Sequence, residues 1–352
     1  MRIAFALAGL GGFNAHGAGF LAAAAKSGVK PELVTATSGQ IMVLADWLAG
    51  RDVRTHLILA GRASGPYDQL RAILFGHPGV FRPAYREALT RLTSPFGLGD
   101  NPFNFFADRL LPAQQYVPQL TDAEVAGVAK TFNDSRIGVV FNSYDPKQGT
   151  GSLYGNDAAR ALLPTEKALP NTHAAHLQAS PHPHDMRYVS DVTSEKEILP
   201  ITAEAVRSAL WLSLYGFQNM PSGQMDGAYH RSCIVSELHV FDRIFVARPL
   251  ADGWRDRPPA NWFEVQDWNT EMWFSVGYKA EVAGLRRIND LIAAGVITDE
   301  KFHKVELCEI EPKTPAGYFH YFVERNDVYD EALGVAEETF TQLGMARPIR
   351  AA

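Results

Sequence analysis

The stretch MRIAFALAGLGGFNAHGAGFLAAAAKSGVKPELVTATSGQIMVLADWLAG, residues 1–50, decides the fold. Residues 3–7 form a short, almost wholly apolar run, which is typical of a strand buried on both faces. After a glycine-rich turn, residues 15–26 are alanine-rich and helix-prone. Residues 33–36 predict a second strand, and residues 40–49 carry apolar side chains at helical spacing. This alternation predicts an α/β protein, a three-layer α/β/α sandwich with a mainly parallel central sheet.

The rest of the chain continues the alternation less regularly. Residues 64–130 are rich in Pro, Gly and Phe and predict a loop or lid insertion. No repeat or long linker divides the chain, so we expect a single domain over residues 1–352 with a variable part after about residue 250. Further strands are expected at 136–144, near 153, at 242–246 and at 305–310, and further helices at 203–215, 261–294 and 327–343.

The composition limits the classes of function. The chain has 33 basic and 39 acidic residues, a formal net charge of −6, and so lacks the basic excess of a nucleic-acid-binding protein. Its two cysteines, Cys233 and Cys308, predict reduced thiols.

Glycines and polar residues interrupt the apolar N-terminal run, which therefore favours strand, turn and helix over a signal peptide. No later run reaches the ~18 apolar residues of a membrane-spanning helix, so we expect a cytoplasmic protein, with any membrane contact peripheral.

The turn GLGGFN, residues 9–14, stands between the first strand and the first helix. Backbone N–H groups in such a turn, together with the helix dipole, attract an anion. A dinucleotide pyrophosphate and the oxyanion of an acyl intermediate both suit it, and a turn without a ligand is the plain alternative. A dinucleotide site needs a glycine where Asn14 stands and an acidic residue at the end of the second strand. That strand ends instead at Thr37, Ser38 and Gly39, which weakens the hypothesis of a nucleotide-binding oxidoreductase.

Ser38 lies in a sharp turn between a strand and an apolar helix. This arrangement is typical of a nucleophile elbow, which lifts a hydroxyl clear of the sheet and places it at a helix N-terminus. The alternative is that Ser38 only caps the helix. Because Ala36 and Gln40 replace the glycines of the G-x-S-x-G pattern, the elbow alone leaves both interpretations open.

Taken together, these segments resemble the patatin-like phospholipase family. LAGLGGFNAHGAGFL, residues 7–21, is similar to the family's glycine-rich segment, and ATSG, residues 36–39, stands where the family has GTSG. MDGAY, residues 225–229, matches the later Asp-Gly-Ala motif in the expected order. The resemblance runs from residue 2 to about residue 247. It implies a patatin-like fold and a serine acyl hydrolase of the lipase or phospholipase A type, which acts on lipid or other acyl esters without a cofactor or metal.

The resemblance also implies a catalytic dyad. Asp226 would accept the proton of Ser38 directly, and the serine would form an acyl-enzyme that water cleaves. Backbone N–H groups of the glycine turn would bind the oxyanion, and small or polar neighbours would support the elbow and the aspartate motif. The oxyanion residues are Gly9, Leu10, Gly11 and Gly12, and the supporting residues are Thr37, Gly39, Gly227 and Ala228.

Other interpretations stay open beside the dyad. The chain departs from the family pattern at Phe13, Asn14, Ala36 and Gln40, which leaves the efficiency and the acyl donor undetermined, and a non-catalytic lipid-binding relative is a separate hypothesis. His230 follows Asp226 by four residues and suggests a Ser–His–Asp triad. Because a nucleophile at position 38 comes too early for an α/β-hydrolase, we interpret His230 as a turn or surface residue.

Two more segments have competing interpretations, and the sequence predicts no oligomeric state. Residues 173–184 hold four histidines at metal-ligand spacings, but the segment is Pro-rich and lacks cysteine, which favours a solvated loop. NWFEVQDWNTEMWFSVGY, residues 261–278, favours a buried helix over an acyl-chain channel or a membrane-facing patch.

Overall fold

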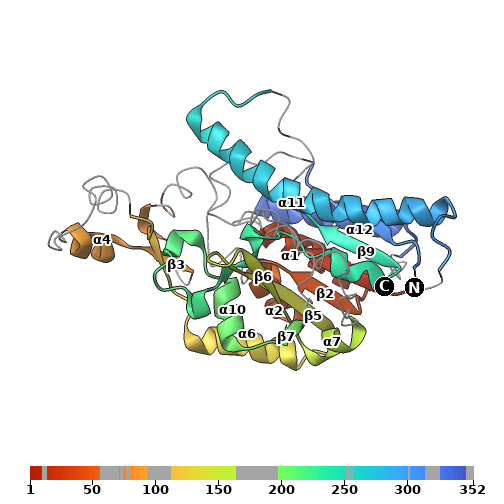
Figure 1. Cartoon of the computed structure of the whole chain (residues 1–352), viewed down its shortest axis with the longest axis horizontal. Coiled ribbons are helices and arrows are strands. Elements are labelled where there is room, and N and C mark those ends of the chain that lie inside the picture. The colour runs from red at the N-terminus through yellow and green to blue at the C-terminus, as the bar shows by residue number, and fades with distance from the viewer. Residues whose placement is uncertain are drawn as a thin grey trace, which may run out of the picture.

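A mixed β-sheet with helices on both faces organises the structure (Figure 1). Its strand order is β10-β9-β1-β2-β5-β6-β7, and β8 pairs with β5. Pairing is parallel except where β5 meets β6 and β8. The computed structural model describes residues 1–9, 14–55, 71, 74–76, 80–92, 112–163, 197–250, 254, 257–299, 302–313 and 326–345.

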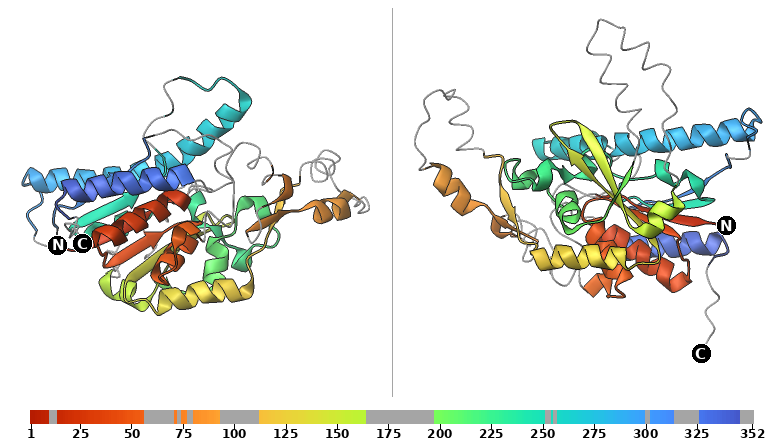
Figure 2. Two further views of the ribbon diagram at one scale, coloured as in Figure 1. Left: turned by 180° about the vertical axis from the view of Figure 1, so that it is seen from behind. Right: turned by 60° about the horizontal axis from the view of Figure 1, so that its bottom comes forward.

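The strands of the main sheet are short and mostly buried. They are β1 (Ile3–Leu7), β2 (Leu33–Ala36), β5 (Gly138–Asp145), β6 (Thr150–Gly155), β7 (Ile198–Pro200), β8 (Met225–Asp226), β9 (Arg243–Ala247) and β10 (Glu306–Ile310). A separate antiparallel pair, β3 (Phe81–Pro83) and β4 (Tyr116–Pro118), lies with the nearby helix α4 to one side of the main sheet in Figures 1 and 2.

The helices differ greatly in length. They are α1 (Asn14–Ser27), α2 (Gln40–Leu48), α4 (Tyr85–Leu92), α6 (Asp122–Asn133), α7 (Asp157–Leu162), α10 (Ala203–Ala209), α11 (Trp262–Ala293) and α12 (Asn326–Gln342). Short 3₁₀ turns occupy Ser213–Tyr215, Pro221–Gly223, Gly227–Tyr229 and Ser236–Val240.

Two apolar clusters, one on each face of the sheet, form the core. Alternate residues of a strand point to opposite faces. Phe5 therefore joins the cluster under α1, α2, α6, α10 and α12, whereas Ala4 and Ala6 join the one under α7 and α11. Phe5 stacks edge-on against Phe20 of α1 with ring centroids 4.8 Å apart. The prediction of a mainly parallel sheet between two helical layers is confirmed.

The structure corrects the sequence-based expectation in two places. Much of the predicted insertion at 64–130 lies outside the described residues, but its last part is not irregular, because α6 is a regular helix that packs against α2 and α10. A capping box, in which Thr121 and Glu124 each accept the other's backbone N–H, starts this helix. The expected helix at 203–215 ends at Ala209 and gives way to a turn that leads toward β8.

Candidate active site

The turn between β2 and α2 holds Ser38 in an unusual backbone conformation. Its φ is +58°, in the left-handed region that residues other than glycine adopt at a cost of about 1–2 kcal/mol. The residue is almost fully buried, and its hydroxyl donates to Asp226. Gly39 occupies the N-cap position of α2, and no side chain caps that end. The interpretation of Ser38 as a helix cap is therefore wrong, and the turn has the geometry of a nucleophile elbow.

Glycines of neighbouring elements make room for two polar side chains beside the elbow. A Cβ at Gly39 would overlap the side chain of Asn14, which fills the space that this glycine leaves. A Cβ at Gly17 of α1 would likewise overlap the side-chain amide of Gln40. Asn14 and Gln40 thus occupy positions where a neighbouring glycine makes room for them, and the elbow is closely packed.

Asp226 is fixed by the end of β8 and by the turn that follows. Its backbone N–H donates to the carbonyl of Trp211 at 3.0 Å, and its Oδ1 accepts the N–H of Ala228 at 2.8 Å. A Cβ at Gly227 would overlap the side-chain amide of Asn142 on β5, so any larger residue there would displace that amide. These contacts hold the carboxylate in one orientation inside the protein, where it is 1% exposed.

The fold brings the two predicted catalytic side chains into direct contact. Ser38 Oγ donates a hydrogen bond to Asp226 Oδ2 although the residues are 188 positions apart. Burial raises the pKa of Asp226 from its ordinary 3.8 to about 7, against the opposing hydrogen bonds from Ser38 and Ala228. Burial, and then the charge of Asp226, also raise the pKa of Tyr215. The carboxylate can therefore exchange a proton near neutral pH.

The glycine turn begins beside the elbow. A Cβ at Gly9 would come within 2.7 Å of the Cβ of Ser38 and overlap the carbonyl of Thr37. The N–H of Gly9 donates to the carbonyl of Ser232 at 2.9 Å, so Gly9 positions the turn and its own N–H is already engaged. The other predicted oxyanion residues, 10–12, lie outside the described residues, as does Phe13.

His230 does not stand between the serine and the aspartate. It is exposed and stacks on Tyr144, with ring centroids 5.5 Å apart and an interplanar angle of 5°. The interpretation as a surface residue agrees with this placement. The histidine-rich segment 173–184 lies outside the described residues, and no group of three or more potential metal ligands occurs within the part of the chain that is described.

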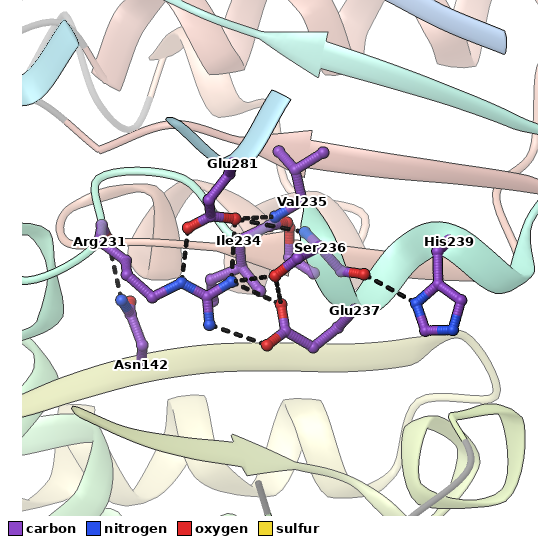
Figure 3. Close-up of polar contacts among 9 residues, drawn as sticks. Asn142, Arg231, Ile234, Val235, Ser236, Glu237, His239 and Glu281 are labelled. Atoms are coloured by element: carbon purple, nitrogen blue, oxygen red, sulfur yellow. Dashed lines mark hydrogen bonds and ion pairs between the residues drawn. The ribbon is translucent and has the colours of Figure 1, made fainter. Parts of the chain in front are cut away.

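A largely buried ion cluster anchors the segment after Asp226 (Figure 3). No sequence pattern predicts this cluster. Arg231 donates to Glu237 at 2.6 Å and to Glu281 of α11 at 2.6 Å. Glu281 also accepts the backbone N–H of Val235 at 3.0 Å. Arg231 and Glu281 are 50 residues apart, so no local motif could have revealed the pair.

The aromatic segment 261–278 forms the start of α11, as expected for a helix, but its predicted burial is wrong. Trp262, Trp268 and Trp273 are exposed. The first half of α11 extends past the end of the sheet in Figure 1.

Fold and contacts together define an α/β protein with a buried serine–aspartate pair at the end of its central sheet. No family model matches the chain, and no curated protein matches it in sequence. None of the helices in the described ranges is long and apolar enough to cross a membrane.

Proposed function

We propose that the protein is a serine acyl hydrolase that cleaves carboxylic esters, with Ser38 as nucleophile and Asp226 as general base. The observation that carries the proposal is the buried hydrogen bond from Ser38 Oγ to Asp226 Oδ2. A general base works best when its pKa lies near the working pH. Burial gives Asp226 such a pKa, about 7, without an intervening histidine.

The first half of the reaction acylates the serine. Ser38 Oγ attacks the ester carbonyl carbon and gives its proton to Asp226, and the carbonyl electron pair moves onto the oxygen. Backbone N–H groups of Leu10, Gly11 and Gly12 are proposed to bind that oxyanion, each donor being worth a few kcal/mol. The intermediate collapses, the carbon–oxygen bond to the alcohol breaks, and the departing alkoxide takes the proton from Asp226.

The second half returns the enzyme to its starting state. A water molecule gives a proton to Asp226 while its oxygen attacks the acyl carbon. Collapse of this second intermediate breaks the bond to Ser38 Oγ, which takes the proton back from Asp226. The net reaction converts an ester and water into a carboxylic acid and an alcohol.

Lipid esters are the proposed substrates, of the kind that a lipase or phospholipase A cleaves. Support comes from the sequence resemblance to patatin-like phospholipases and from the order of elbow and Asp-Gly-Ala motif along the chain. The patatin-like form of the fold is proposed on the same basis. A nucleotide-binding oxidoreductase is disfavoured because β2 ends without an acidic residue, and titration with NAD or FAD should show no micromolar binding.

Active-site labelling tests the proposal. A fluorophosphonate should label Ser38 covalently, and peptide mapping should locate the label there. Ser38→Ala should abolish labelling and hydrolysis of a chromogenic ester, and Asp226→Ala should reduce kcat at least about a hundredfold. His230→Ala should keep most of the activity.

Each alternative predicts a different pattern. If His230→Ala is as inactive as Asp226→Ala, a triad replaces the dyad. If Ser38 takes no label and no ester is cleaved, the protein is a non-catalytic relative and the proposal fails.

A further inference from the structure

The first half of α11 presents several exposed apolar side chains. Trp262 is 65% exposed, Trp273 67% and Val276 65%. At 100° per residue these three positions fall on the same side of the helix, together with Val265 and Met272. The exposed Asn269 lies within the same arc, so the face is mainly rather than wholly apolar. A large exposed apolar face often marks a binding surface.

A cavity of about 500 Å³ opens along this face. Six residues of α11, among them Met272, Trp273 and the polar Asn269, form one wall, and Ala228, His230 and Ser232 form the other. The volume lies within the range of small-molecule sites, roughly 300–1,000 Å³. Most of the lining is apolar, and His230, Ser232 and Asn269 supply its polar groups, so the site suits a ligand that is mainly apolar where it enters.

The cavity shares its inner wall with the supports of the serine–aspartate pair. Ala228 lines the cavity and donates its N–H to Asp226 Oδ1 at 2.8 Å. Ser232 also lines it, and its carbonyl accepts the N–H of Gly9, the glycine packed against Ser38. The cavity therefore adjoins the reacting groups rather than lying at a remote surface.

We infer that this cavity binds an unbranched hydrocarbon chain of the ester substrate, held between α11 and the segment from Ala228 to Ser232. The identification of the ligand as a substrate rests on the proposed hydrolase function, whereas the binding of the chain does not. The mainly apolar walls recognise the chain by burial, and the adjoining serine–aspartate pair meets the ester group at its end.

Chain length provides the first test, with two series of chromogenic or coupled-assay esters that vary the acyl or the alcohol chain from two to twelve carbons. Each buried methylene should raise kcat/KM about three- to fourfold until the cavity is full. A rise in either series supports the inference and identifies the chain that enters. Equal kcat/KM along both series would overturn it.

Two matched glycine variants test whether the cavity causes the dependence of kcat/KM on chain length. A Cβ placed at Gly277, which lines the cavity, meets no atom within 4 Å, and the same is true at Gly284, two turns further along α11 and outside the cavity. Gly277→Phe should fill the cavity and lower the ratio of kcat/KM for long-chain over short-chain esters at least tenfold. Gly284→Phe makes the same change in the same helix and should leave that preference intact. If both variants behave alike, the cavity is not the chain site.

A direct binding measurement tests the chain site independently of the proposed catalysis. In the Ser38→Ala variant, which cannot turn over an ester, calorimetry should detect binding of dodecanoate, and Gly277→Phe added to this variant should weaken it at least tenfold. Binding without any hydrolysis by the parent protein would sustain the chain site and refute the hydrolase. Hydrolysis without dodecanoate binding and without chain-length dependence would sustain the hydrolase and refute the chain site.

Discussion

Replacing Asp226 by asparagine should abolish ester hydrolysis and, at the same time, stabilise the fold above pH 7. Asparagine has nearly the same shape as aspartate. Its Oδ1 can still accept the N–H of Ala228, and its Nδ2 can donate to Ser38 Oγ in place of the bond that the serine now donates. The substitution therefore removes a buried charge and the general base while it keeps both hydrogen bonds.

The size of the stabilisation follows from the pKa of Asp226. Burial raises that pKa from 3.8 to about 7, so the folded protein favours the protonated form. The parent protein thus loses stability as pH rises from about 4 to about 7. Three pKa units at about 1.4 kcal/mol each give a loss of about 4 kcal/mol at pH 8. An unfolding entropy of about 2.1 cal/mol/K per residue over 352 residues converts this loss into about 5 °C.

Thermal or urea unfolding of the parent and Asp226→Asn proteins between about pH 4 and pH 8 measures this difference in stability. The variant should match the parent near pH 4 and exceed it at pH 8, since effects of all other groups cancel in the difference. Asp242 provides a control of opposite sign, because a hydrogen bond from the backbone N–H of Arg2 holds its pKa below the usual value. Asp242→Asn should lose stability at pH 8. An Asp226→Asn protein that gains nothing between pH 4 and pH 8 would refute the desolvation on which the base depends.

Three further outcomes are expected. The kcat/KM for a chromogenic ester should rise with pH through about 7, as Asp226 loses its proton, and a profile flat from about pH 5.5 to 8.5 would contradict a carboxylate base. Gly39→Ala should destabilise the protein by about 1–3 kcal/mol in urea unfolding, because its methyl group would overlap Asn14, and adding Asn14→Gly should restore much of the loss. Arg231→Met should cost about 3–5 kcal/mol by leaving two glutamates without their cation, and a loss below about 1 kcal/mol would show that water reaches them.

Local sequence patterns predicted much of the sheet and its helices. The apolar run of β1, the short strand β2 and the helical spacing in α2 are each visible in a few consecutive residues. The structure has these elements at the predicted positions. The helix α6 was also predictable, since the residues Thr-Asp-Ala-Glu at 121–124 form a capping box. The three-residue strand β7 is too short for any periodicity to show.

The candidate site was likewise predictable only where it has a local sequence pattern. The elbow at Ser38 has a local pattern, but only the fold determines that Asp226, 188 residues later, meets it. The cluster around Arg231 pairs a short turn with a distant helix, so it has no local pattern. The exposure of Trp273 depends on how far α11 extends beyond its neighbours, and an aromatic-rich helix has the same sequence pattern whether it is buried or exposed.

The position of β1 between β2 and β9 has a consequence for synthesis of the chain. Translation at about 5–20 residues per second would add Asp226 some 10–40 s after Ser38. During that interval the apolar strand β1 has β2 on one side and, on the other, a bare edge that only the later β9 can cover. The nascent chain therefore exposes an unpaired strand edge and holds Ser38 apart from Asp226, which favours association with chaperones until β9 has been synthesised.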